Sequence, residues 1–440
     1  MFQAGFARVD VTPPLGTPLA GYAVERFANG VLDPLELNCV VFSDGETKAA
    51  LITADFLYVM ENAATPIRKM ISEKCDIPME NVFMQGLHQH TSVRIGCIPN
   101  SPYVGVEDEA YLDVLYRKYC DVVTLALLDM KDASLEMAEK EAEPKFSFIR
   151  RYYLKDGSLQ TNPFKHLDKI DRPAYQSDNM VRVLRLKREG AKDIAIVNFS
   201  CHPDVIGGKK FSADWCGFVR RHTEKTLPDV HCVLVNGAQG DSNHIDFMTY
   251  KEGTPYSNYA ISEKMGKGIS DVAVSIWNET KPMETGKIWG KVVMKYVPTN
   301  TRGIERFQEC AELAQRIRDG EEVTLPEGLT RSQVLSVEAL KDGYLFQKVP
   351  VSVLCLGKLG FVGFGGEPFT HYATKAREAG KDMYIVTACL TNGGQGYLPT
   401  AQAFSEGGYE TSSSSRYTPV VEEIITGAAA KLLEEYRNIK

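Results

Sequence analysis

The chain has 440 residues, 44% of them hydrophobic, and a net charge of −7 from 50 basic and 57 acidic side chains. This composition supports a large globular core, and the absence of any basic block excludes nucleic acid as the expected partner. No apolar run is long enough to span a bilayer, and residues 1–10 show no cationic and apolar leader, so we expect a cytoplasmic protein without an integral membrane segment. Ten cysteines are scattered singly, which predicts reduced core thiols and no disulfide framework.

The first hundred residues predict a β-β-α-β unit. Residues 4–11 alternate like a strand until prolines and a glycine break the pattern. Two apolar runs, 38–43 and 49–55, are joined by turn residues and predict a β-hairpin. A helix at 63–74 then leads to a strand at 81–85.

That strand runs into His88 and His90. With the period of two of a strand, both imidazoles point to the same face, close enough to share one ion or one substrate. A lone histidine is usually structural, but a His-x-His pair at a strand end indicates a metal or substrate site more specifically.

The middle of the chain supplies further candidates at strand ends. An amphipathic helix is predicted at 107–130, and Arg150 and Arg151 follow a short strand at 146–149. Such arginines are either solvated or orient a substrate. His202 follows the second strand of a pair at 180–186 and 193–200, with Pro203 fixing the turn.

A helix is expected from Ser212 to about residue 226, in which Asp214 either starts the helix or supports an imidazole. A strand at 231–235 ends in a polar loop that contains Ser242. In chain order, the remaining patterns predict a helix at 257–277, a strand at 287–296, charged helices at 305–319 and 332–340, strands at 346–356, 358–364 and 383–388, and a final amphipathic helix from Thr418.

Glu367 follows the strand at 358–364, and Tyr397 lies in the loop after the strand at 383–388. We therefore predict an α/β fold, with a mixed β-sheet core, flanking helices and a metal site at the C-terminal ends of the strands. Residues 1–440 are expected to form a single catalytic domain with a helical excursion at about 298–345. Two imidazoles and a carboxylate make a catalytic zinc set with a position left for water.

Several segments, in this order, resemble the catalytic domain of the neutral (non-lysosomal) ceramidase family. They are Gly5 to Pro14 with Gly21-Tyr22, Gly86-x-His88-x-His90, Cys201-His202-Pro203, Ser212-x-Asp214-x-x-Gly217, Gly240-Asp241, Gly366-Glu367, Gly396-Tyr397-x-x-Thr400 and Tyr409-Glu410. Each motif alone is modest, but their order and several spacings match over nearly the whole chain.

The resemblance implies a Zn²⁺ ion held by His88, His202, Glu367 and Tyr397. It also implies that His90, Arg150 or Arg151, and Tyr409 position or polarise the amide of a substrate; of the two arginines we favour Arg151.

The chain departs from the family pattern beside the His-x-His pair and around Ser242. The family reads His-x-His-Ser-Gly-Pro where this chain has Thr91, Ser92 and Val93 after its second histidine. Ser242 stands one residue out of register with the serine that the family uses in hydrolysis. Neither a secretion signal nor a C-terminal immunoglobulin-like module is recognisable, so a smaller soluble N-acyl compound is expected as substrate in preference to ceramide.

The leading hypothesis is a zinc-dependent amidohydrolase that cleaves an N-acyl amide by a metal-activated water, with His90, Tyr409, Arg151 and Ser242 as catalytic candidates. The alternative is a metal- or ligand-binding homologue that has lost hydrolysis. A cysteine hydrolase using Cys201 beside His202 is disfavoured, because adjacent residues of a strand point to opposite faces. The sequence leaves a homo-oligomer open.

Overall fold

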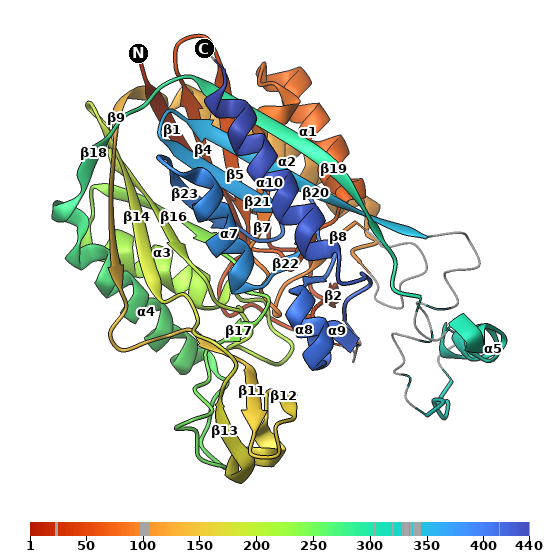
Figure 1. The fold of residues 1–440 in the computed structure, drawn as a ribbon. Coiled ribbons are helices and arrows are strands. Elements are labelled where there is room, and N and C mark those ends of the chain that lie inside the picture. Colours follow the sequence, from red (N-terminus) through yellow and green to blue (C-terminus); the bar gives the residue numbers. More distant parts are fainter. Residues whose placement is uncertain are drawn as a thin grey trace.

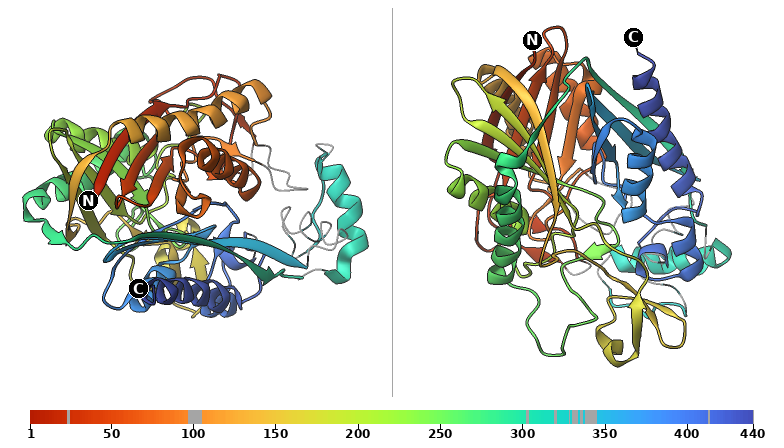
Figure 2. Two further views of the ribbon diagram at one scale, coloured as in Figure 1. Left: turned by 90° about the horizontal axis from the view of Figure 1, so that it is seen from above. Right: turned by 60° about the vertical axis from the view of Figure 1, so that its left-hand side comes forward.

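Two β-sheets pack face to face, and helices cover both outer faces (Figures 1 and 2). The computed structural model describes residues 1–22, 25–96, 105–301, 304–318, 321–327, 329, 334, 337, 345–412 and 414–439. The core between the sheets contains Phe42 and Phe83 of the larger sheet and Leu354 and Phe361 of the smaller one. The α/β fold class expected from the sequence is confirmed.

The larger sheet is mixed. In spatial order its strands are β16 (Val230–Asn236), β15 (Asp193–Phe199), β14 (Met180–Arg188), β9 (Lys131–Glu141), β1 (Gln3–Asp10), β4 (Glu36–Ser43), β5 (Lys48–Ala54) and β7 (Val82–Gly86), and β18 (Lys281–Met283) pairs with β9. The pairs at the two ends of this order, β15 with β16 and β5 with β7, are parallel. The predicted hairpin is confirmed, with Ser43 opposite Lys48.

The sequence analysis did not predict β9. Its residues are mostly charged or are good helix formers, and only Leu135 is fully buried. The strand forms because it pairs with β14 along nine residues and with the start of β1. Tertiary pairing therefore overrides local propensity here.

The smaller sheet consists of β19 (Ile288–Pro298), β20 (Phe346–Leu356), β21 (Leu359–Phe364) and β23 (Tyr384–Ala388). β21 and β23 are parallel, and the other pairs are antiparallel. Short strands complete the fold: β2 (Pro18–Leu19), β3 (Arg26–Phe27), β6 (Tyr58–Val59), β8 (Arg94–Ile95), β10 (Phe148–Ile149), β11 (Arg151–Leu154), β12 (Leu159–Thr161), β13 (Ile170–Pro173), β17 (Ser242–Asn243), β22 (Glu367–Pro368) and β24 (Tyr397–Leu398).

The helices bury one apolar face each. α1 (Glu61–Cys75) and α2 (Glu109–Leu128) pack on the β1–β4–β5–β7 part of the larger sheet, and α3 (Asp214–Thr226) and α4 (Tyr259–Ser275) pack on the β14–β16 part. α7 (Thr370–Gly380) and α10 (Val421–Arg437) cover the smaller sheet, while α8 (Ala401–Glu406) and α9 (Tyr409–Ser412) lie near its other end (Figure 1). Among the described helices, none has the length and apolar character needed to cross a membrane.

α5 (Phe307–Arg318) stands apart from both sheets (Figure 1) and has a small apolar cluster of its own around Cys310 and Ala314. It corresponds to the first helix of the predicted excursion. Most of the second predicted helix, 332–340, lies outside the described residues. That residues 1–440 form a single catalytic domain stays a prediction.

The carboxyl ends of three strands meet at one place. The side-chain amide of Gln85, in β7, donates to the backbone carbonyls of Asn236 at 2.6 Å and Cys389 at 2.9 Å. Asn236 ends β16, and Cys389 directly follows β23. The loops that leave these strands are therefore brought together, and they carry the candidate site.

Candidate metal centre

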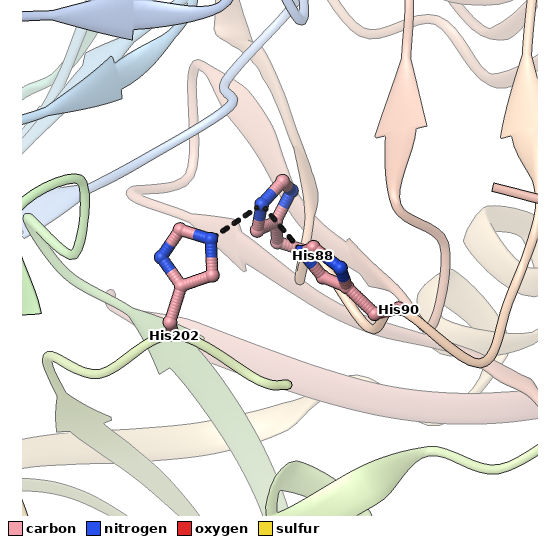
Figure 3. Close-up of side chains that lie close together, drawn as sticks. All are labelled: His88, His90 and His202. Carbon is pink, nitrogen blue, oxygen red and sulfur yellow. Dashed lines mark hydrogen bonds between the residues drawn. The ribbon is translucent and has the colours of Figure 1, made fainter. Parts of the chain in front are cut away.

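Three buried histidines converge at these strand ends. The Nε2 atom of His88 lies 3.1 Å from Nε2 of His202 and 3.3 Å from Nε2 of His90. Figure 3 shows the three rings turned toward a common point. The ring nitrogens lie close enough together to serve as ligands of one metal ion, so the prediction of a metal site at strand C-terminal ends is supported by the geometry.

The convergence of His88 and His90 has a different cause from the one we predicted. β7 ends at Gly86, and His88 has a positive φ of 80°, so the pair lies beyond the strand and its alternation. Hydrogen bonds hold the turn instead: the backbone N–H of His88 donates to Phe56 O at 2.9 Å, and that of His90 donates to Pro203 O at 3.1 Å. The second of these bonds ties the two histidine-bearing loops together.

Backbone carbonyls orient two of the three rings. Nδ1 of His88 lies 3.3 Å from Leu57 O, and Nδ1 of His202 lies 3.1 Å from Gln239 O. A carbonyl can only accept, so each Nδ1 carries the proton and each Nε2 presents its lone pair to the centre. Burial lowers the pKa of His202, and the charges of Arg150 and His88 lower it further, which keeps this ring in the neutral form that binds metals.

Glu367, in the short strand β22 that follows β21, completes the cluster. Its Oε2 atom lies 3.1 Å from His88 Nε2 and 3.6 Å from His202 Nε2, while its Oε1 atom accepts a 2.6 Å hydrogen bond from the Tyr58 hydroxyl. Burial raises the pKa of Glu367, but the hydrogen bond from the Tyr58 hydroxyl and the charge of Arg150 act in the opposite direction and favour the ionised form. The carboxylate is therefore ionised at neutral pH.

Tyr397 stands beside Glu367, because β22 and β24 pair in parallel with these two residues opposite each other. The Tyr397 ring stacks on the His202 ring at 6.2 Å between centroids, and it meets the Tyr409 ring edge to face at 5.8 Å. Tyr409 is half exposed at the rim of the cluster. The structure thus brings both predicted tyrosines to the histidines.

The two adjacent arginines differ in what they face. The guanidinium of Arg150 lies 5.1 Å from the centroid of the Tyr397 ring, donates to Gly240 O at 2.7 Å and pairs with Glu410 at 2.9 Å. Arg151 instead pairs with Glu410 at 3.0 Å and Glu406 at 3.2 Å and donates to Gly407 O at 2.9 Å. Of the two arginines, Arg150 lies against Tyr397. Arg151, which we preferred from the sequence, contacts Glu406, Gly407 and Glu410 instead.

Ser242 is connected to the centre through one atom. Its hydroxyl lies 3.4 Å from Gln239 O, the carbonyl that also faces Nδ1 of His202. Cys201 turns away from its neighbour His202 and contacts Phe146 O at 3.8 Å. Burial raises the pKa of the Cys201 thiol, which removes the thiolate that a cysteine hydrolase needs.

Sequence reasoning missed Tyr58, Gln239 and Asp204. Tyr58 lies just beyond the end of β5, and Asp204 lies two residues after His202. The signal that could have found them is the one that found the histidines, a polar residue shortly after a buried strand, but it is weaker for residue types that are common in loops.

Comparison with known proteins places the fold. No protein-family model and no curated protein sequence matches the chain. Among solved structures, the fold is similar to that of neutral ceramidase from Pseudomonas aeruginosa, with a TM-score of 0.75 and 15% identity over 99% of this chain and 74% of that one. It is also similar to a ceramidase complexed with C2, with a TM-score of 0.72 and 14% identity over 99% of this chain and 75% of that one.

At these identities the similarity concerns the fold. The resemblance inferred from the sequence motifs is confirmed at that level, over nearly the whole chain.

Proposed function

We propose that the chain is a zinc-dependent amidohydrolase that cleaves an N-acyl amide bond. The observation that carries the proposal is the convergence of three buried imidazoles and the Glu367 carboxylate at the ends of strands. The fold, which is similar to that of a neutral ceramidase, supports the reaction class.

The residues fit a zinc ion chemically. Oε2 of Glu367 is buried, and within the described residues no donor is aligned for a hydrogen bond to it. A buried anionic oxygen without a donor is costly unless a cation compensates it. Nitrogen and carboxylate oxygen donors are the ligands of catalytic zinc sites. We assign His88, His202, Glu367 and Tyr397 as the residues that hold the ion.

Bound zinc supplies hydroxide at neutral pH and polarises a carbonyl oxygen. The chain's own residues then have separate tasks. His90, whose Nε2 faces the centre but which we leave out of the ligand set, takes the proton of the attacking water and returns it to the leaving amine. Arg150 and Tyr409, at the Tyr397 side, hold the amide oxygen. Ser242, through Gln239 O, helps to hold the ring of His202.

The substrate we propose is a small N-acyl compound. The cytoplasmic location stays a prediction from the sequence, which leaves a homo-oligomer open.

The decisive experiment measures the metal content of the purified protein by mass spectrometry and its activity on N-acyl amides, from ceramide down to short N-acyl amino acids. Wild type is expected to hold about one zinc per chain and to lose activity with a chelator. His88→Ala and Glu367→Ala are expected to lose the metal. His222→Ala is the matched control, because His222 lies on α3 and pairs with Glu263 at 3.6 Å.

A folded wild type without metal would contradict the zinc assignment. Bound zinc without turnover of any acyl amide would instead favour the alternative, a metal-binding homologue that has lost hydrolysis.

A further inference from the structure

One carboxylate at the centre has no task in the proposed function. Asp204 is half buried, and its Oδ1 atom lies 3.6 Å from Nδ1 of His90. The hydroxyl of Tyr22 donates a hydrogen bond to the same oxygen. Nδ1 of His90 is buried and has no hydrogen-bond partner among the described residues. Asp204 is therefore a carboxylate acceptor beside a buried nitrogen that lacks a hydrogen-bond partner among the described residues.

The segment that carries Tyr22 is pressed against the His90 ring. Gly21 has a φ of 104°, and a Cβ atom at this position would lie 2.6 Å from His90 Nδ1, so a larger residue would be both strained and in collision. The Tyr22 ring lies 5.0 Å from the His90 ring between centroids. Arg26 stacks 4.1 Å from the Tyr22 centroid and donates to His90 O at 2.7 Å. Ring and backbone of His90 are thus held from the same side.

The three histidines consequently differ at Nδ1. His88 and His202 face backbone carbonyls, whereas His90 faces a carboxylate. A carboxylate is the stronger acceptor, and a histidine that donates to one becomes a better base at its other nitrogen. This difference separates a proton-transferring histidine from two neutral ligands.

We propose that Asp204 is a positioning residue that accepts the Nδ1 proton of His90, with Tyr22 holding the carboxylate in place. The proton on Nδ1 leaves the lone pair of Nε2 directed at the centre. The 3.6 Å separation is longer than a hydrogen bond, and such contacts commonly tighten when the site is filled. The tautomer assignment stands by itself, whereas its consequence for hydrolysis rests on the proposed function.

The test reads the tautomer directly. The full chain is labelled with ¹⁵N-histidine, and two-bond ¹⁵N–¹H spectra are recorded without and with added zinc; the eight histidines keep the spectra simple. The His90→Gln variant identifies the signals of His90. We expect His90 to carry its proton on Nδ1 in wild type. Asp204→Asn should lose this preference, Asp204→Glu should keep it in part, and Tyr22→Phe should weaken it.

The Glu263→Gln variant is the matched control, since Glu263 pairs with His222 at the same 3.6 Å on the surface. It should leave the His90 signals unchanged. A proton on Nε2 of His90 in wild type, or an unchanged His90 pattern in Asp204→Asn, would overturn the proposal and reduce Asp204 to a partner of Tyr22. If Asp204→Asn does not fold, Tyr22→Phe and Asp204→Glu decide in the same way.

Kinetics on an active N-acyl amide add the functional readout. Asp204→Asn is expected to lower kcat about 10- to 100-fold, the usual effect of removing the partner of a site histidine, with KM and zinc content nearly unchanged. Asp204→Glu should recover part of the loss. If His90 carries its proton on Nδ1 but wild type cleaves no N-acyl amide, the proposed function alone is contradicted. If Asp204→Asn folds and has a normal kcat, the positioning role alone is overturned.

Discussion

Two buried carboxylates at strand ends, Asp55 and Glu367, show how differently one chemical group can be used. Asp55 follows β5 and is paired on both oxygens: Arg220 donates to them at 3.0 and 2.5 Å, and Gln89 and the backbone N–H of Glu36 add bonds of 2.9 Å each. Glu367 has the Tyr58 bond on one oxygen, whereas the other lies near the imidazoles of His88 and His202 and has no hydrogen-bond partner among the described residues.

Both side chains are fully buried, so burial does not distinguish them. What distinguishes them is whether the protein itself satisfies the charge. A satisfied carboxylate holds the fold together, and an unsatisfied one is available to a ligand.

The segment 88–90 connects the two. His88 and His90 turn toward the histidine cluster, and Gln89 between them donates to Asp55. The paired carboxylate therefore anchors the peptide that carries two of the site's imidazoles.

The largest effect is expected from Arg220→Met, which removes the cation that pairs with Asp55. Losing the cation leaves a buried carboxylate uncompensated, so we expect the unfolding free energy to fall by about 3–5 kcal/mol, measured by urea denaturation. The neighbouring Arg221→Met is the control: its side chain is 40% exposed and pairs with Asp33 at 3.1 Å, so it should cost about 1 kcal/mol or less. Equal losses in the two variants would show that the Asp55 pair has no special role.

Arg150 and Arg151 allow a second comparison, between an arginine beside Tyr397 and one that faces glutamates. Arg150→Lys is expected to lower kcat/KM about 100- to 1,000-fold, because an oriented donor near the reacting amide is lost. Arg151→Lys should lower it less than about tenfold, since its guanidinium faces Glu406 and Glu410. Both variants keep a cation beside Glu410 and lose guanidinium hydrogen bonds, so similar losses of stability are expected and serve as the control. Steady-state kinetics in which Arg151→Lys is the more impaired variant would return the role to Arg151.

Asp214 offers a smaller, pH-dependent effect. Its carboxylate accepts hydrogen bonds from the backbone of Val205, Ile206 and Trp215 and from Ser262, and it forms no ion pair within the described part of the chain. Burial raises its pKa from 3.8 to about 6 against the effect of these hydrogen bonds.

Because the folded protein binds this proton more tightly than the unfolded chain, stability is lost as the pH rises from about 4 to about 6. Asp214→Asn removes the titration, so the unfolding free energy of wild type relative to the variant should fall by up to about 3 kcal/mol over that interval and stay constant above it. Urea unfolding at several pH values measures this difference. A gap that does not change between pH 4 and 6 would contradict the raised pKa.

Most of the fold could be predicted from the sequence because its periodicities are strong. The hairpin of β4 and β5, the helices α1 to α4 and the strands that precede each histidine follow directly from apolar patterning. β9 could not be predicted, since its residues have no strand signal and its partner β14 lies about forty positions away.

Part of the candidate site could likewise be predicted from the sequence, and part of it could not. Polar residues after buried strands are visible in the sequence, which is why His88, His202 and Glu367 could be named. The choice between Arg150 and Arg151 depends on where β11 begins, at Arg151, and a one-residue difference of this kind is below the accuracy of pattern reading. The ring orientations depend on carbonyls of Leu57 and Gln239, whose positions are set by tertiary structure alone.

The hydrogen bond between Tyr58 and Glu367 joins residues 309 positions apart. During synthesis at about 5–20 residues per second, roughly 15 to 60 seconds therefore separate the appearance of these two side chains. Throughout that interval the His88 and His90 imidazoles exist without their carboxylate. A metal ion bound as proposed would therefore have its carboxylate ligand only after the C-terminal strands have docked, so the complete ligand set would form at the end of folding.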